Sequence, residues 1–449
     1  MRRIITSGLM AALLVLGPGQ VLADDGVAAQ LKAMQDRMSQ LEDKLEATSD
    51  ELAVANKRVD EQHQLIEYAG IGGGMEHSSG LSAFLEKVEM GGWISGSYVY
   101  NFEGMHGSKL AGANSGPGVM PFKGDSNSFQ LDQLWFEIEK GVTEDSRAGF
   151  RADIVYGKTA GLLNGGTGSN NGTLGDELEL YQAYIQYLAP IFGGTTFKFG
   201  KFGTVIGAEV AGSRDNLNIT RGHVYNLFEP ITHVGVLAST DLNDSWSLSL
   251  GLANETRSFP AADKDSNNNK TVLWSLGWGG ETTGFSFAGA YGSADSGQAV
   301  DTKSGDKEMI LDFILSWDPS DRFTSYVNLD FIDSENSTTA SSEFDGYGVS
   351  VAGRYALTDG AGMALRLEYA KLEYDANTVS GTESEEKNYW GLTGTIDYAL
   401  TDDLLMKAEL RYDDSGSSDD GLENAFMDDD GLMTEDSQFI GAVELIYTF

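Results

Sequence analysis

The side chains that could carry chemistry in this chain are mostly charged, and they match no known catalytic motif. Cysteine is absent, so neither a disulfide nor a thiolate metal site can form. The five histidines include no H-E-x-x-H zinc pattern, and the sequence has neither a G-x-S-x-G motif nor a phosphate-binding loop. We therefore expect no catalytic residue, no bound metal and no cofactor. What remains is electrostatic chemistry, in which fixed charges attract or repel ions and polar molecules.

The segment Gly203–Thr232 combines charged side chains with apolar ones such as Ile206, Leu227 and Phe228. Its ionisable residues are Glu209, Arg214, Asp215, Arg221, His223 and Glu229. Apolar side chains at this density would not stay in bulk water, so we predict a loop that folds into a barrel and narrows its pore with these charges. The alternative is that the apolar side chains pack at a subunit interface.

A second group of charged residues lies between apolar neighbours in segments that alternate with a period of two. Lys198 stands between Phe197 and Phe199, and Arg366 stands between Leu365 and Leu367. A charge on the hydrocarbon side of a membrane-spanning strand costs about 2–4 kcal/mol, so this parity directs the charges to a water-filled interior. The predicted lumen-wall residues are Arg151, Lys198, Arg366, Lys407 and Arg411. They either oppose the loop in solute selection or form an ion-pair network that stiffens the wall.

The elements that must position these residues are strands, and the alternation predicts about sixteen of them. The expected strands are Val88–Asn101, Ser128–Lys140, Arg147–Tyr156, Leu178–Tyr187, Thr195–Phe202, His233–Thr240, Trp246–Asn254, Thr271–Trp278, Phe285–Tyr291, Lys307–Trp317, Phe323–Asp333, Phe344–Leu357, Met363–Tyr374, Lys387–Leu400, Leu404–Tyr412 and Gln438–Phe449. Short links alternate with long ones rich in Gly, Ser, Asn and Asp. This asymmetry is typical of an all-β transmembrane barrel with periplasmic turns and outward loops.

The last strand places apolar side chains at Val443, Leu445, Tyr447 and Phe449 and polar ones between them. An apolar face opposite a polar face fits a wall with hydrocarbon outside and water inside. A chain that ends on an aromatic residue also resembles the signal by which the outer-membrane assembly machinery selects its clients. We therefore expect a location in the outer membrane of a Gram-negative bacterium, with Phe449 recognised by that machinery.

The sequence before the barrel predicts three further segments. Residues 1–23 have the basic start, apolar stretch and small-residue end of a signal peptide. Residues 24–69 repeat apolar residues every seven positions, which predicts a periplasmic coiled-coil helix and a homotrimer; a marginal amphipathic helix or a spacer is the alternative. Residues 70–86 read as a Gly-rich linker, and the barrel spans 87–449.

The charge balance limits the partners. The chain has 68 acidic and 30 basic residues, a formal net charge of −38. Such a surface repels nucleic acid. Compatible partners are outer-membrane lipids with lipopolysaccharide, to which cations would form bridges, and a small-molecule solute. The loop Asp414–Asp436 is acidic without a basic residue, but its spacing does not match a calcium-binding EF-hand, so a solvated loop is favoured over a calcium site.

Three stretches carry a family resemblance. They are Gly200-Lys201-Phe202, Arg214-Asp215-Asn216 and the run from Phe228 through Glu229-Pro230-Ile231-Thr232-His233 to Val236. Together they resemble the OmpL-like beta-barrel porin family, whose members share a strand, an inward loop and a similar re-entry. The coiled coil followed by a barrel is similar to the LbtU family of siderophore porins.

These resemblances imply a porin for passive uptake of small solutes with the loop at 203–232 as its constriction. Uptake of a siderophore or metal chelate is the alternative that the second resemblance implies. A structural tether or adhesin is a further alternative, in which the predicted helix rather than the loop would carry the role.

Overall fold

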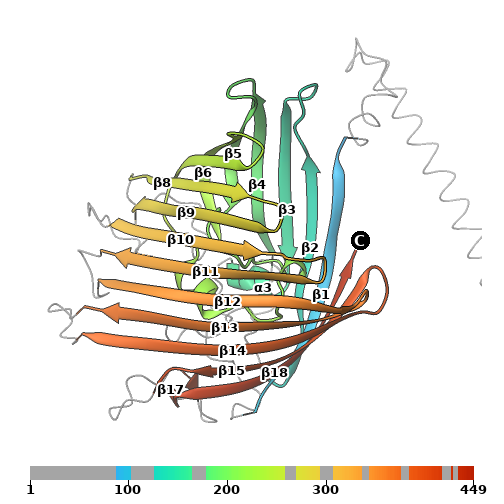
Figure 1. Cartoon of the computed structure of the whole chain (residues 1–449), viewed down its shortest axis with the longest axis vertical. Coiled ribbons are helices and arrows are strands. Elements are labelled where there is room, and N and C mark those ends of the chain that lie inside the picture. Colours follow the sequence, from blue (N-terminus) through green and yellow to red (C-terminus); the bar gives the residue numbers. More distant parts are fainter. Residues whose placement is uncertain are drawn as a thin grey trace, which may run out of the picture. The chain divides into compact units, whose positions relative to one another are not determined.

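The structure is a computed structural model (Figure 1) that describes residues 87–102, 126–163, 178–257, 269–293, 307–335, 343–375, 384–416, 426–427 and 433–449. The chain divides into Met1–Ala83 and Phe84–Phe449, and every described residue lies in the second unit. The signal peptide, the coiled coil and the linker lie outside the described residues. Most of the acidic loop Asp414–Asp436 also lies outside them, so all four expectations remain predictions.

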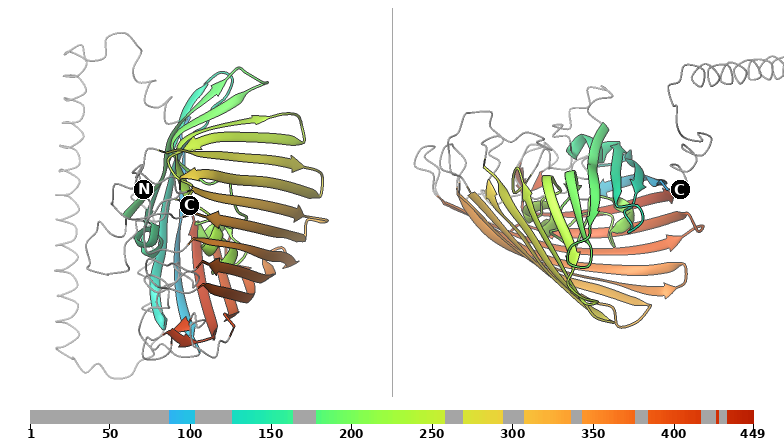
Figure 2. Two further views of the ribbon diagram at one scale, coloured as in Figure 1. Left: turned by 90° about the vertical axis from the view of Figure 1, so that its left-hand side faces the viewer. Right: turned by 90° about the horizontal axis from the view of Figure 1, so that it is seen from above.

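Sixteen antiparallel strands form one closed barrel. They are β1 (Glu89–Asn101), β2 (Ser128–Lys140), β3 (Ala148–Tyr156), β4 (Leu178–Ala189), β5 (Thr195–Gly203), β6 (Thr232–Asp241), β7 (Trp246–Ala253), β8 (Thr271–Gly279), β9 (Thr283–Ser293), β10 (Lys307–Trp317), β11 (Phe323–Ser334), β12 (Phe344–Thr358), β13 (Ala361–Tyr374), β14 (Glu385–Ala399), β15 (Leu404–Asp414) and β18 (Ser437–Thr448). Each pairs with its neighbour in sequence, and β1 pairs with β18 from Trp93↔Thr448 to Asn101↔Ile440, which closes the wall (Figures 1 and 2). The closed sheet leaves no strand edge unpaired.

The alternation of side chains explains why these segments form a barrel wall. In β13, Arg366 and Glu368 point inward and are buried, whereas Leu365 and Leu367 point outward and are about half exposed. Residues directly opposite in register share a face, so Arg366 lies beside Thr393 on β14 and Leu365 beside Gly394. An outer face that is apolar strand after strand suits hydrocarbon, and the inner face suits water or polar partners.

The observed strands confirm the predicted ones, and each end lies within two residues of its predicted position. The additional elements are short: α3 (Lys158–Leu163), the 3₁₀ helix η2 (Ser213–Asp215), α4 (His223–Phe228), and the hairpin of β16 (Phe426–Met427) with β17 (Met433–Glu435). Within the described part of the chain, helices long and apolar enough to cross a membrane are not found.

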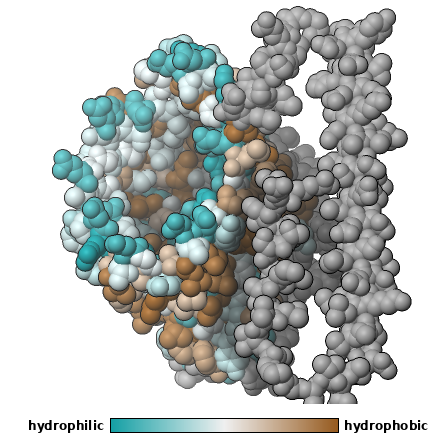
Figure 3. Space-filling model, turned by 90° about the vertical axis from the view of Figure 1, so that its right-hand side faces the viewer, coloured by the Kyte–Doolittle hydropathy of each residue, from teal (hydrophilic) through white to brown (hydrophobic). Residues whose placement is uncertain are grey.

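The end of the barrel where the short turns lie is hollowed. Figure 3 views the molecule from this side and shows hydrophilic residues around a rim and hydrophobic residues deeper inside. Inside the wall lies the connection between β5 and β6, residues 204–231, which we call the inner loop. In Figure 2 its green ribbon lies within the curve of the strands.

Candidate pore constriction

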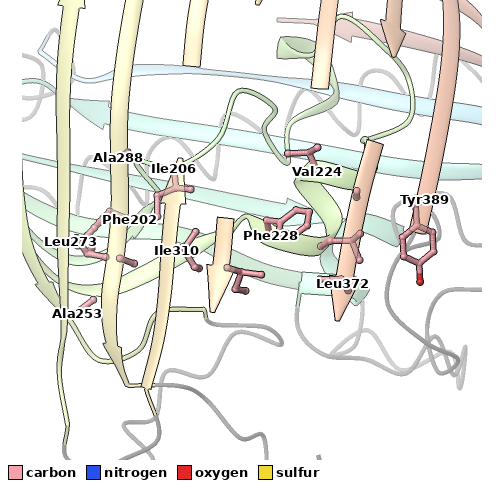
Figure 4. Close-up of a cluster of buried hydrophobic side chains, with 14 of the residues drawn as sticks. Phe202, Ile206, Val224, Phe228, Ala253, Leu273, Ala288, Ile310, Leu372 and Tyr389 are labelled. Carbon is pink, nitrogen blue, oxygen red and sulfur yellow. The ribbon is translucent and has the colours of Figure 1, made fainter. Parts of the chain in front are cut away.

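Apolar side chains fix the inner loop against the inside of the wall. Ile206, Val224 and Phe228 of the loop are fully or almost fully buried. They share one cluster with inward residues of the strands, which include Leu273, Ala288, Ile310, Ile332, Leu372 and Tyr389 (Figure 4). Gly346 and Gly348 of β12 leave the space that the Phe228 ring occupies, since a Cβ at Gly348 would lie 2.7 Å from it. The loop is therefore folded inward, as its composition predicted.

Hydrogen bonds to uncharged side chains hold the first part of the loop. The Ala208 N–H donates to Asn328 Oδ1 on β11 at 2.9 Å. Gln133 on β2 accepts from the Ser213 N–H at 2.9 Å and donates to the Ala211 carbonyl at 2.7 Å. The loop is thus attached to opposite parts of the wall, and a buried backbone that keeps its hydrogen bonds avoids a large desolvation cost.

A buried carboxylate and a buried guanidinium hold the middle of the loop. Glu409 on β15 accepts from the Ile219 N–H at 2.6 Å and from the Thr220 N–H and hydroxyl at 3.1 and 2.6 Å. Arg366 on β13 donates to Glu209 Oε1 and to the Thr220 carbonyl, both at 2.6 Å. Each charge lies in a buried site where its partners replace water, and charge-assisted bonds of this kind are the stronger ones.

Charged side chains of β15 also hold the part of the loop where helix α4 begins. Arg411 on β15 donates to the Arg221 carbonyl at 2.6 Å and to Asp413 at 2.8 Å. Asp413 in turn contacts His223 Nε2 at 2.9 Å. Lys407, two residues before Glu409, donates to the Asn216 carbonyl at 2.6 Å. Most of the predicted wall cations therefore hold loop carbonyl groups.

The exit of the loop contains a group of buried carboxyl side chains. Glu229 lies near Asp312 of β10 and Asp330 of β11, and Asn328 donates to both aspartates at 2.6 and 3.2 Å. One oxygen of each carboxyl group has no hydrogen-bond partner among the described residues. Burial, with the neighbouring Asp330 and Asp312, raises the pKa of Glu229 well above its ordinary value. Gly207 makes room for this side chain, because a Cβ there would meet Glu229 Oε2 at 1.8 Å.

The predicted loop residues occupy two kinds of place. Glu209, Arg221, His223 and Glu229 are buried between the loop and the wall, whereas Arg214 and Asp215 reach open space. Of the predicted wall residues, Arg366, Lys407 and Arg411 are buried beneath the loop. Arg151 and Lys198 line a cavity that the loop leaves free. Their roles in solute selection remain predictions.

This cavity, which we call the side chamber, lies between the inner loop and β1–β5 and has a volume of about 340 Å³. Arg151 bridges three carboxylates of its wall, Glu137 at 2.8 Å, Glu139 at 3.1 Å and Asp153 at 2.8 Å. Arg214 stacks on the Trp93 ring at 4.2 Å and pairs with Asp215 at 3.1 Å. The side chamber thus combines fixed charges of both signs with aromatic rings.

Sequence reasoning missed several residues that hold the loop. Glu409 and Asp413 share the parity of Lys407 and Arg411, so the alternation placed them inside but did not show that they bind backbone groups. Gln133 lies at a register shift between β1 and β2, and Asn328 gives no signal in the sequence. Groups of three or more side chains suited to hold a metal ion are absent from the described residues.

The closed barrel with a loop packed across its interior defines the class as an outer-membrane porin. The family model of Putative beta-barrel porin-2, OmpL-like, matches residues 87–449, and the chain belongs to this family. The family and the fold indicate the bacterial outer membrane and a passive channel. Comparison with curated proteins gives no match.

Solved structures share the fold at low sequence identity. One is OmpT with its loop L8 deleted, an outer membrane protein of Vibrio cholerae, with a TM-score of 0.51 and 11% identity over 81% of this chain and 99% of that one. The anion-selective porin from Comamonas acidovorans gives 0.51 and 10%, again over 81% and 99%. The outer membrane channel DcaP of Acinetobacter baumannii gives 0.50 and 11% over 81% and 97%.

Proposed function

We propose that the inner loop is the constriction of this porin and that solutes pass it through the side chamber. The observation that supports this proposal is the division of charges along the loop. Most of the buried charged side chains form hydrogen bonds within the loop or with the wall, whereas Arg214 and Asp215 face open space together with Arg151 and Lys198. Fixed charges that border a narrow passage filter solutes by charge and size.

The assembly of the whole protein is also a proposal. A signal peptide at residues 1–23 would direct secretion, and a coiled coil at 24–69, joined by the linker at 70–86, would hold three copies together in the periplasm. Outer-membrane lipids and lipopolysaccharide would cover the apolar outer face, and the assembly machinery would recognise Phe449. The siderophore and tether alternatives depend on the predicted coiled coil at 24–69, which lies outside the described residues.

Conductance in planar bilayers tests the channel. The purified barrel should give stepwise ionic currents in potassium chloride, and Asp215→Asn should change the preference for potassium over chloride. Asp244→Asn, in the turn between β6 and β7, is the matched control because Asp244 lies away from the loop. A correctly folded protein that passes no current would refute the proposal.

A further inference from the structure

The side chamber has two chemically different regions. The aromatic region contains Trp93 and Trp135, stacked at 4.7 Å, and Tyr181, which meets Trp135 edge-on at 4.6 Å. Ile206 and Ile231 of the inner loop line the same cavity. The charged region contains Arg151 and Lys198 on β3 and β5. A ligand that fills such a cavity needs an apolar body and a charged group.

Lys198 is the group in the charged region that can still bind a ligand. The other inward cations of the described wall hold carboxylates or carbonyl groups, as Arg151 holds Glu137, Glu139 and Asp153. The Lys198 ammonium lies 4.8 Å from the centre of the Tyr184 ring and makes no hydrogen bond or ion pair with a described residue. An ammonium has three donors and no acceptor, so it can bind an anionic or carbonyl oxygen.

A second unused donor lies in the aromatic region. The Trp135 indole is buried, and its Nε1–H finds no acceptor among the residues that the structure describes. The adjacent Trp93 provides the comparison, because its Nε1–H donates to Gln133 at 2.8 Å. A buried indole N–H usually has a partner, so Trp135 adds a polar group to the aromatic region that the described residues leave unsatisfied.

We infer that the side chamber binds a small organic acid during passage, with its carboxylate on Lys198 and its apolar body against Trp135 and Tyr181. This inference rests on the proposed function and deepens it by naming the class of solute. The volume of about 340 Å³ is at the lower end of the range for small-molecule sites. It therefore suits a body the size of one aromatic ring.

A competing class of solute follows from the acidic groups of the same wall. Glu137, Glu139 and Asp153 outnumber Arg151, so their long-range field favours cations. All three carboxylates are engaged by Arg151, however, and Glu209 and Asp215, which also line the side chamber, are engaged by Arg366 and Arg214. Lys198, in contrast, has open donors. Direct contact with the Lys198 ammonium at hydrogen-bond distance in a partly desolvated site outweighs the screened field of carboxylates whose oxygens already bind arginine.

Calorimetric titration of the full chain in detergent tests the inference without relying on conductance. The probes are benzoate, its neutral isostere benzamide, acetate, which lacks the apolar body, and benzylammonium, which reverses the charge. We expect benzoate to bind most tightly. Lys198→Met should weaken benzoate binding about tenfold or more, since the bond to a charged donor is lost. Trp135→Leu, which removes the aromatic face against which the ring would pack, should weaken it severalfold.

Lys387→Met is the matched control. Lys387 also lies over a tyrosine ring, 5.9 Å from the centre of Tyr374, but it pairs with Glu385 and does not line the side chamber. This variant should leave benzoate binding unchanged. Lys198→Gln serves if Lys198→Met does not fold.

Three results would overturn the inference: equal binding of benzoate and benzamide, tighter binding of benzylammonium, or the same effect from the Lys198 and Lys387 variants. The channel proposal is tested separately. A protein that binds benzoate but passes no current would refute the channel and still support the binding site.

Discussion

At the scale of single residues, the inner loop is held by charged side chains of the wall that bind its backbone. Glu409 accepts three hydrogen bonds from Ile219 and Thr220 and a fourth from the Thr395 hydroxyl at 2.7 Å. A buried carboxylate with four donors is well satisfied, and an amide in its place could not accept them all. Glu409 is therefore a structural group, although its charge and inward position also suit a filter.

We expect Glu409→Gln to loosen the inner loop. The amide nitrogen would face N–H donors, and each donor left unsatisfied costs about 1–3 kcal/mol. Hydrogen exchange at Ile219 and Thr220 should become faster, and the open-channel current should become noisier. Glu386→Gln, at the exposed start of β14, is the control. Unchanged exchange at both positions would contradict the assigned role of Glu409.

At the scale of elements, the helix α4 is positioned by packing more than by its own stability. It has only six residues, too few for an isolated helix to be stable in water. Five of the six are buried, and its contacts reach β11, β12, β13 and β14. The position of the loop exit therefore depends on how well these side chains fill the interior.

Removal of the Phe228 ring tests this dependence. Phe228→Ala should cost about 3–5 kcal/mol where the cavity stays empty, because the ring is fully buried beside Gly346 and Gly348. We expect a lower unfolding temperature in detergent and a larger, more variable conductance. Phe199→Ala removes a ring from the outer face of β5, where it is 65% exposed, and should have a much smaller effect on both. Equal effects of the two substitutions would show that α4 does not hold the loop.

Most of the wall could be predicted from the sequence, and the details of the loop could not. The period of two predicts which side chains face inward, and the structure places Arg366, Lys407 and Arg411 in buried positions on the inner face of the wall. Parity does not say whether an inward charge meets water or another part of the chain, and that depends on the path of the inner loop. The contacts of Asn328 and Gln133 link positions far apart in sequence, which no local pattern reveals.

At the scale of the whole molecule, the carboxyl group of Glu229 makes stability depend on pH. Because burial raises the pKa of Glu229 in the folded state, folding is favoured while the group is protonated. This contribution is complete below the ordinary pKa of a glutamate, about 4.3, and is lost as pH rises through the raised value. The loss amounts to about 1.4 kcal/mol per pH unit in that range.

We expect the unfolding temperature in detergent to fall from acidic to alkaline pH, and Glu229→Gln to reduce this fall because the amide does not ionise. Glu179→Gln, at a carboxylate paired with Lys201 at 2.5 Å, should leave the pH profile near that of the unchanged protein. An identical pH dependence with and without Glu229 would exclude it as the titrating group.

The pairing of β1 with β18 has a consequence for biogenesis. Trp93 and Thr448 are neighbours in the wall although 355 positions separate them in sequence. The seam can form only after the ribosome has finished the chain, and until then the first strand has a free edge that invites aggregation. Such a polypeptide requires chaperones that keep it unfolded until it reaches the site of insertion. A chain without its last strand should be degraded by proteases.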